Sequence, residues 1–396
     1  MTTESYDPFG EAEMLDARPA YAALRAHDPV HRLAGYDAWA LAGFDAVWQA
    51  CGDTNSFSVR RGQTPCQVLL GEPAMNLTFP ELDPPEHRLR RRVLAPYYTR
   101  DAANVDASLI RSIAAEVLEP LLETGTFDAF DDYASQVAAR FAAQKAGVPA
   151  GEADRIRRLL HVAIAREPGQ RGTSEANANA MVAVFGELQT LIVAARADRS
   201  RATGLLAELL GASVKDVPLA DAQIAAELHT LLVTGSETVE LAVAAALVNL
   251  ARHPDQQAAC LADPTLAMWA FAEAVRFDHP TDVLCRVVAC DVEVGGHVLR
   301  EGQGVLLLWG SANRDEKVFP DAEQFDIHRR SEQTLLFGHG QHKCIGEHLG
   351  MRMGAIILET FLASIRGWEI DESALRRRRG EFLKGFNTVP VSIVRR

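Results

Sequence analysis

The sequence that decides the fold reads Phe337-Gly338-His339-Gly340-Gln341-His342-Lys343-Cys344-Ile345-Gly346. Its glycines permit backbone angles that other residues resist, so this loop can turn tightly and approach a flat ligand closely. An apolar helical pattern follows from about residue 347 to residue 364 (Leu349, Met353, Ile356, Ile357, Phe361). We therefore expect Cys344 where a glycine-rich loop enters a helix, and there free N–H groups and the helix dipole favour a thiolate over a thiol.

A cysteine thiolate in such a loop is what an axial haem ligand requires. A free cysteine is more often one more small buried hydrophobic residue, but here the glycines, His342 and the helix all have fixed positions relative to Cys344. The loop resembles the cysteine-ligand loop of the cytochrome P450 family, Phe-Gly-x-Gly-x-His-x-Cys-x-Gly, at every specified position. The resemblance implies that Cys344 binds the iron of haem b. It also implies that the cofactor site includes Phe337, Gly338, His342, Ile345 and Gly346.

Composition and charge limit the possible partners. The 396 residues are 48% hydrophobic and 23% charged, and 40 basic against 53 acidic residues give a net charge of −13. A net acidic chain argues against nucleic acid as a main partner. No uninterrupted apolar run reaches the roughly 18 residues of a membrane span, no signal peptide is visible, and the cysteines show no metal-finger spacing. These features predict a reduced, cytoplasmic protein with no membrane and no nucleic-acid partner.

Strand signals at both ends of the chain enclose a long helical region. Short strands are expected at 29–33 and 38–41, and strand signals return at 285–294 and 304–309. From about residue 86 to residue 275, apolar residues recur three and four apart. A small sheet built from both ends favours one intertwined domain over residues 1–396. The expected fold class is mainly α with a small β-sheet region, and the resemblance implies a cytochrome P450-like fold that forms a single haem-thiolate catalytic domain.

A long helix is expected from about residue 219 to residue 251, with a polar segment, Thr234-Gly235-Ser236-Glu237-Thr238, in its middle. A mid-helix glycine costs about 1 kcal/mol relative to alanine, and its missing side chain leaves room for a ligand. The alternative is a kink whose hydroxyls bond back to the backbone. The segment resembles the family's oxygen-activating Ala/Gly-Gly-x-Asp/Glu-Thr motif. This implies that Gly235 adjoins the cofactor and that Glu237 and Thr238 relay protons, although Thr234 replaces the usual small residue.

Haem propionates are anions and need basic partners. The segment Asp83-Pro84-Pro85-Glu86 predicts a helix start with a capping acid and a proline at the first helical position. This start places His87 and Arg91 one turn apart on one face. The resemblance assigns four residues to the propionates, namely His87, Arg91, Arg286 and His342.

Glu273 and Arg276 lie three apart on an expected helix with apolar flanks, so they are positioned to pair. They match the family's Glu-x-x-Arg, a structural network behind the haem. In the family, the usual third member of this network is an arginine or histidine from a segment that residues 319–326 resemble. In this sequence Gln324 stands at that position. The basic run from Arg376 to Arg379 is expected to be a solvated turn.

The ordered motifs imply a haem-thiolate monooxygenase that inserts one atom of O2 into a small, largely apolar organic substrate. The segment from Phe271 to Arg329 resembles family members that act on small aromatic acids and ethers. Electrons would come from a separate ferredoxin or flavodoxin. A basic docking patch for that partner is expected from Arg88, Arg90, Arg92, Lys343 and Arg352. By family analogy, the substrate would contact Val233, Thr234, Val283, Leu284 and Phe386. An H2O2-using peroxygenase and a non-catalytic haem sensor are the alternatives, and the Glu237-Thr238 pair argues against both.

Overall fold

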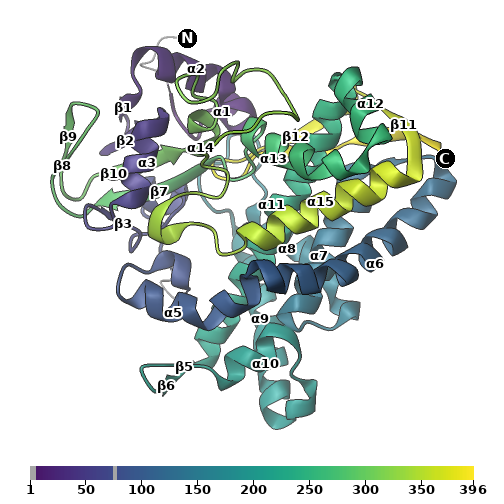
Figure 1. The fold of residues 1–396 in the computed structure, drawn as a ribbon. Helices are drawn as coiled ribbons and strands as arrows, with labels where there is room; N and C mark the ends of the chain where they lie inside the picture. The colour runs from purple at the N-terminus through teal and green to yellow at the C-terminus, as the bar shows by residue number, and fades with distance from the viewer. Residues whose placement is uncertain (1–5, 75–77) are drawn as a thin grey trace.

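The computed structural model describes residues 6–74 and 78–396. Figure 1 shows the main sheet and the N-terminal helices gathered on one side of the molecule and the long helices on the other. The longer helices are α2 (Arg18–His27), α3 (Phe44–Gly52), α5 (Glu86–Leu94), α6 (Arg100–Thr124), α7 (Ser135–Ala146), α8 (Ala153–Ile164), α9 (Glu175–Ala197), α10 (Gly204–Gly211), α11 (Asp221–Arg252), α12 (Pro254–Ala262), α13 (Ala267–Phe277) and α15 (Glu347–Ser364). Shorter ones are α1 (Glu11–Asp16), α4 (Pro65–Leu69) and α14 (Trp309–Ala312).

The largest sheet joins the two ends of the chain, as expected. Its strand order is β1 (Val30–Leu33), β2 (Ala38–Leu41), β10 (Gly304–Leu308), β7 (Val283–Val288) and β3 (Phe57–Ser58). The strand β2 pairs in parallel with β10, so that Ala38 lies opposite Gly304. A parallel pair needs a long connection, and here that connection is the helical body of the protein.

Smaller sheets complete the β structure. A second sheet has the order β11 (Ile365–Ile370), β14 (Pro390–Arg395) and β4 (Thr126–Asp128). Among the described residues, three two-stranded sheets pair β12 (Arg376–Arg378) with β13 (Gly385–Thr388), β5 (Ser213–Val214) with β6 (Val217–Pro218), and β8 (Val292–Val294) with β9 (His297–Leu299). The expectation of a solvated turn at Arg376–Arg379 is therefore wrong, because most of that run is strand and Arg378 is buried.

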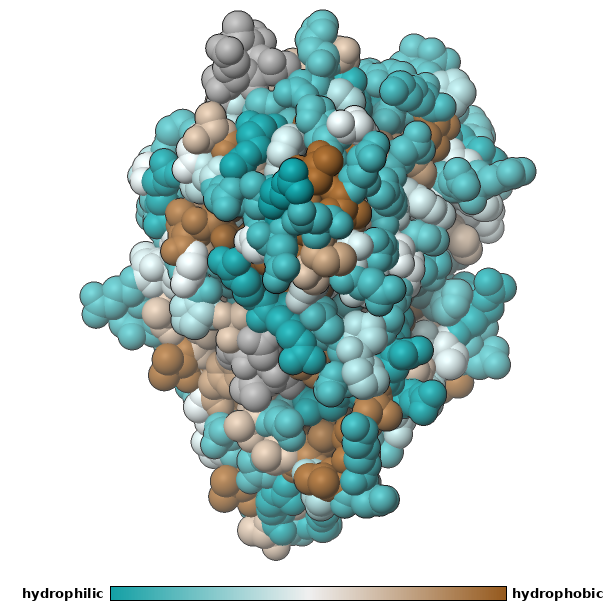
Figure 2. Space-filling view, turned by 90° about the vertical axis from the view of Figure 1, so that its left-hand side faces the viewer, coloured by the Kyte–Doolittle hydropathy of each residue, from teal (hydrophilic) through white to brown (hydrophobic). Residues whose placement is uncertain are grey.

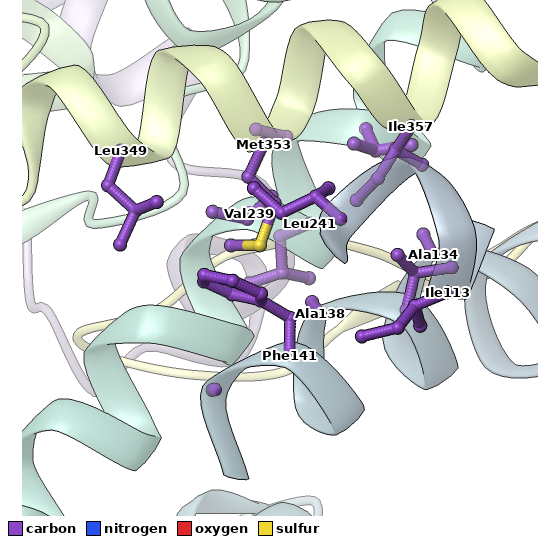
Figure 3. Close-up of a cluster of buried hydrophobic side chains, with 14 of the residues drawn as sticks. Ile113, Ala134, Ala138, Phe141, Val239, Leu241, Leu349, Met353 and Ile357 are labelled. Carbon is purple, nitrogen blue, oxygen red and sulfur yellow. The ribbon is translucent and has the colours of Figure 1, made fainter. Parts of the chain in front are cut away.

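The helix α11 forms the centre of the molecule. Its residues from Val239 to Leu250 are buried without a break, as expected for a helix that is surrounded by other helices. Figure 3 shows side chains from three elements meeting there: Phe141 of α7, Val239 of α11 and Met353 of α15. The face of the molecule seen in Figure 2 is mostly hydrophilic with scattered apolar residues. The buried apolar side chains form a large cluster around α11.

Two helices, α9 and α11, are long and apolar enough to cross a membrane by length and composition alone. This finding does not conflict with the absence of long uninterrupted apolar runs, because an average over a window tolerates single polar residues. The apolar window of α11 is 78% buried inside the protein and that of α9 is 28% buried. The composition of α11 is thus that of a core helix.

Candidate active site

The loop before Cys344 turns as its glycines allow. Gly338 and Gly340 have φ values of 75° and 69°, in the left-handed region that glycine adopts without strain. A Cβ atom at Gly338 would lie 2.6 Å from the Trp309 ring, and one at Gly340 would lie 2.5 Å from the Cys51 carbonyl oxygen. The Cys344 N–H donates to the Phe337 carbonyl at 2.8 Å. The helix α15 then begins at Glu347, as the sequence predicts.

Cys344 lines a large cavity at this loop, and its accessible surface faces that cavity. Burial raises the pKa of the Cys344 thiol, while a hydrogen bond from the Gly346 N–H and the charge of Arg91 act in the opposite direction. The Gly346 N–H thus favours the thiolate as expected, while burial outweighs it. A bound metal ion is what deprotonates a coordinating thiol.

The middle of α11 lines the same cavity. Its contributors are Thr230, Leu231, Val233, Thr234, Gly235, Thr238 and Val239. The Thr238 hydroxyl donates to the Thr234 carbonyl at 2.9 Å, and the Thr234 hydroxyl donates to the Thr230 carbonyl at 2.8 Å. Both threonine hydroxyls thus bond back to the helix backbone although both residues line the cavity. Each hydroxyl oxygen keeps lone pairs that can accept a hydrogen bond. A Cβ atom at Gly235 would make only an ordinary 3.7 Å contact with Ala142.

Glu237 does not face the cavity. It is 1% exposed, and its Oε2 accepts a hydrogen bond from Arg378 of β12 at 2.8 Å. Consecutive residues of a helix point about 100° apart, so Thr238 can line the cavity while Glu237 points elsewhere. The expectation that Glu237 and Thr238 lie side by side at the cavity therefore holds only for Thr238. Thr238 lies at the cavity, and Glu237 lies in a buried charged cluster beside it.

The four basic residues assigned to propionates all line this cavity. Burial lowers the pKa of His87 to about 4 and that of His342 to about 2, with nearby arginine charges adding to the effect. Both imidazoles are consequently neutral near pH 7. Among these four residues, the positive charges come from Arg91 and from Arg286, which is 3% exposed and donates to the Cys285 carbonyl at 2.7 Å.

Two buried N–H groups at the cavity have no partner within the described residues, Nε2 of His87 and Nε1 of Trp309. The Gln341 amide nitrogen lies 3.0 Å from Nδ1 of His87, and a neutral ring that accepts there carries its proton on Nε2. Buried donors normally have acceptors. Two unpartnered donors, two arginines and a cysteine sulfur around apolar walls fit haem b, whose propionates supply acceptors and whose iron takes a sulfur ligand.

The start of α5 differs from the predicted capping. The helix begins at Glu86 with Pro85 at the N-cap and no side-chain cap. The Asp83 carboxylate instead accepts from the Ser58 hydroxyl at 2.6 Å and the Val59 N–H at 3.0 Å. It therefore fastens the segment before α5 to the strand β3. His87 and Arg91 still lie one turn apart, because the helix covers both.

Behind the cavity, Glu273 and Arg276 form a buried pair with two hydrogen bonds, at 2.7 and 2.8 Å. The third member is Arg329, whose Nε lies 3.3 Å from Glu273 Oε1. Arg329 was not predicted because it lies just beyond residues 319–326, where the family's third member was expected. Gln324 takes part through its backbone, since its carbonyl accepts from Arg276 at 3.0 Å. The departure at Gln324 therefore leaves the network complete.

Three of the five expected substrate contacts, Val233, Thr234 and Leu284, line the cavity. Val283 and Phe386 do not. Successive residues of a strand point to opposite faces, so Leu284 of β7 faces the cavity while Val283 is buried in the core. Phe386 is also buried, beneath Arg377 at 4.6 Å. The expected pocket ranges 228–234 and 281–284 do reach the cavity, through Thr230, Leu231 and Thr281 among others. Lining residues that the sequence did not indicate include Gln63, Phe79, Pro80, Tyr98, Trp309, Phe382 and Leu383.

The cavity and its donor set define the class of this molecule as a haem-thiolate protein. A family model described as Cytochrome P450 matches residues 175–374. The chain is 30% identical over 400 residues to the vitamin D(3) 25-hydroxylase of Pseudonocardia autotrophica, which covers 99% of this chain and 97% of the relative. It is 29% identical to the putative cytochrome P450 123 of Mycobacterium tuberculosis, over 98% of this chain and 96% of the relative.

Solved structures agree with these sequence relatives. Cytochrome P450 CYP109Q5 from Chondromyces apiculatus superimposes with a TM-score of 0.87 at 25% identity and covers all of both chains. Cytochrome P450 CREJ in complex with (4-ethylphenyl) dihydrogen phosphate gives a TM-score of 0.87 at 27% identity, over 99% of this chain and all of the other. The chain belongs to the cytochrome P450 family. It is a monooxygenase, an oxidoreductase that binds haem b.

Proposed function

We propose that this enzyme inserts one atom of O2 into a small, largely apolar organic substrate with electrons from a separate ferredoxin or flavodoxin. The observation that carries the proposal is that Cys344 and Thr238 line one apolar cavity. The other oxygen atom leaves as water, so each turnover takes up two electrons and two protons. Residues 1–396 would act as one catalytic domain, and we place the enzyme in the cytoplasm.

The chain's own residues hold the cofactor and exclude water. When bound, haem b supplies the redox chemistry that splits O2 and oxidises a C–H bond. The Cys344 sulfur would ligate its iron, while Arg91, Arg286 and the unpartnered N–H groups of His87 and Trp309 would hold its propionates. All five side chains line the cavity.

The walls near α11 indicate an uncharged substrate. Leu231, Val233 and Leu284 provide apolar surface, and the threonine oxygens of α11 provide acceptors. The lining residues with full positive charge are Arg91, Arg286 and Lys343, and the two arginines are assigned to the cofactor. Small aromatic ethers and alcohols fit this surface better than acids do, because a buried carboxylate needs a cationic partner.

The central residue of the proposal is Thr238, whose hydroxyl would hold and pass a proton at the cavity. We expect Thr238→Ala to leave haem content and substrate affinity near those of the wild type while diverting electrons to H2O2. Thr238→Ser, which keeps the hydroxyl, serves as the control. The measurement is product formed per NADPH consumed. A wild-type ratio in Thr238→Ala would contradict the role.

One assay separates this function from its alternatives. The monooxygenase consumes O2 and forms product with NADPH and a ferredoxin system, and methoxybenzene is a suitable probe because its oxidation releases formaldehyde. A peroxygenase would release formaldehyde efficiently with H2O2 alone. A haem sensor would release none under either condition. Product that requires both NADPH and ferredoxin supports the proposal.

The predicted docking patch needs revision before it is tested. Arg90 is buried and pairs with Glu227 at 3.0 Å, and Lys343 pairs with Glu347 at 2.7 Å. Arg88 and Arg92 are exposed on α5, and Arg352 on α15 contacts Asn104. We propose that these three arginines steer an acidic redox partner toward the Cys344 side of the molecule, since long-range steering depends on such clusters.

Reversing Arg88 and Arg352 to Glu should slow the first electron transfer from ferredoxin, leave substrate binding unchanged, and weaken the salt dependence of the rate. Stopped-flow reduction at low and high ionic strength measures this. The control is the double reversal of Arg366 and Arg395, which makes the same charge change at the paired strands β11 and β14. Equal rates of first electron transfer in the two double variants would show that these arginines do not steer the redox partner.

A further inference from the structure

A buried charged cluster lies on α11 beside the cavity. It consists of His161 from α8, Glu237 and Glu240 from α11, and Arg378 from β12. His161 Nε2 lies 2.9 Å from Glu240 Oε1 and 3.7 Å from Glu237 Oε1. Arg378 holds the other oxygen of Glu237 at 2.8 Å. This cluster, named the His161 cluster below, joins three elements that are distant in sequence and includes none of the cavity-lining residues.

Only one member of the His161 cluster has substantial contact with solvent. The His161 side chain is 24% exposed, whereas those of Glu237 and Glu240 are 1% and 0% exposed and that of Arg378 is 8% exposed. Glu240 Oε2 is buried without a hydrogen-bond partner within the described residues. His161 is therefore the member of the cluster that water reaches most readily.

By distance alone, His161, Glu237 and Glu240 could hold a metal ion, since their ligand atoms lie within 4.8 Å of one another. Charge decides against it. Two carboxylates, one guanidinium and a divalent cation would leave a net charge of +1 in a buried place, which is costly. Two carboxylates, the guanidinium and a protonated imidazole sum to zero. A proton on His161 thus balances the cluster, and a metal ion does not.

The groups that face His161 support a charged imidazole. They are Glu237 and Glu240 from α11, Arg378 from β12, and the uncharged ring of Phe130, which stacks at 5.9 Å. Burial lowers the pKa of His161, but the hydrogen bond and charge of Glu240 and the charge of Glu237 outweigh burial, so the net shift is upward. Burial and the charge of Glu240 raise the pKa of Glu237. Because these groups interact strongly, they hold and release protons as a unit.

We propose that His161 is the entry point through which protons from solvent reach Glu237 and, from there, the Thr238 side of α11. The imidazolium gives its Nε2 proton to a carboxylate oxygen of Glu240 or Glu237 and regains one from water, so one proton enters for each one passed on. A protonated Glu237 is held less strongly by Arg378, because the ion pair is then lost. Glu237 is adjacent in sequence to Thr238, whose hydroxyl lines the cavity. This inference rests on the proton-relay role proposed for Thr238.

The decisive variant is His161→Gln. Glutamine can keep a hydrogen bond to Glu240 but cannot carry a proton at neutral pH, so a purely structural role survives the change. We expect unchanged haem content and unchanged binding of methoxybenzene. Formaldehyde released per NADPH should fall by about tenfold or more, as for the loss of a proton-transfer group. His27→Gln, at an exposed histidine of α2, is the matched control and should behave as the wild type does.

The pH profile gives a readout that structural damage would not reproduce. In the wild type, formaldehyde per NADPH should fall as pH rises through the pKa of His161, because the imidazole then carries no proton to give. His161→Gln should lack this limb. Independently of turnover, NMR of histidine-labelled ferrous carbonmonoxy enzyme should show a His161 pKa above the ordinary value, and Glu240→Gln should lower it.

The outcomes separate the two proposals. If Thr238→Ala uncouples the enzyme but His161→Gln keeps both the wild-type ratio and the wild-type pH profile, His161 is not the entry point and the relay stands. If neither variant changes the ratio, the relay itself is wrong. The proposal is supported if formaldehyde per NADPH falls in both variants and if the fall with rising pH is absent only in His161→Gln.

Discussion

At the residue scale, the buried ion pairs show which charges the fold depends on. Glu273 is 4% exposed and is shared by Arg276 and Arg329, whereas Glu372 makes a solvent-exposed pair with Arg252 at 2.7 Å. Breaking a buried pair by removing one partner leaves the other charge buried and uncompensated. An exposed charge is stabilised by water instead.

We therefore expect Glu273→Ala to lower the free energy of unfolding by about 3 to 5 kcal/mol, with loss of bound haem. Glu372→Ala, the same substitution opposite another arginine, should cost about 1 kcal/mol or less. Urea denaturation followed by circular dichroism measures both. Equal losses in the two variants would mean that the Glu273 network does not stabilise the fold.

The sequence predicted those residues whose roles follow from local pattern. Cys344 and its glycines, the pair Glu273 and Arg276, and the helical partners His87 and Arg91 are each specified by a short spacing. The direction of Glu237, the burial of Arg378 and the part of Arg329 depend on which distant segments meet. A single sequence carries little signal for contacts between distant segments, so these features could be seen only in the structure.

At the element scale, α15 carries the Cys344 loop and packs against α13 and α11. The close approach of α13 depends on Gly354. A Cβ atom there would lie 2.1 Å from a ring atom of Phe271, which is a core residue with 2% exposure. Because Phe271 also lines the cavity, a shift of the ring would change both the packed core and the cavity wall. Gly354 thus sets the distance between α13 and α15.

Gly354→Ala should lower the free energy of unfolding by about 1 to 3 kcal/mol, as overpacking does in a packed core. Gly186→Ala on α9, where an added Cβ meets nothing within 4 Å, should raise it by about 0.5 to 1 kcal/mol through helix propensity. Thermal or urea unfolding of the two variants gives opposite signs. A stabilised Gly354→Ala would contradict the packing described here.

At the scale of the whole molecule, Asp278 links the two ends of the chain to the core. Its carboxylate pairs with Arg18 at 3.3 Å and Arg377 at 3.1 Å and accepts from Asn249 of α11 at 3.0 Å. Burial alone would raise its pKa, but the charges of Arg377 and Arg18 outweigh burial and hold the pKa of Asp278 well below its ordinary value. The folded state therefore favours the ionised form of Asp278.

A lowered pKa in the folded state makes a stability contribution that is complete above the unfolded pKa of about 3.9 and is lost as pH falls toward the folded pKa. The difference in free energy of unfolding between the wild type and Asp278→Asn should thus be constant above about pH 5 and shrink below about pH 4. Urea midpoints at several pH values measure it. A difference that stays constant in acid would show that the charge of Asp278 is not what stabilises the fold.

The central claim is that Cys344 supplies a thiolate to haem iron, and the absorption spectrum of the reduced, CO-bound enzyme tests it most directly. Thiolate ligation of the iron would shift the main band of this CO complex to the red. We predict this band in the wild type and its loss in Cys344→Ser. In Cys344→His, which keeps a ligand for the iron, haem should remain bound with an unshifted band. A red-shifted band that persists in either variant would show that another residue binds the iron.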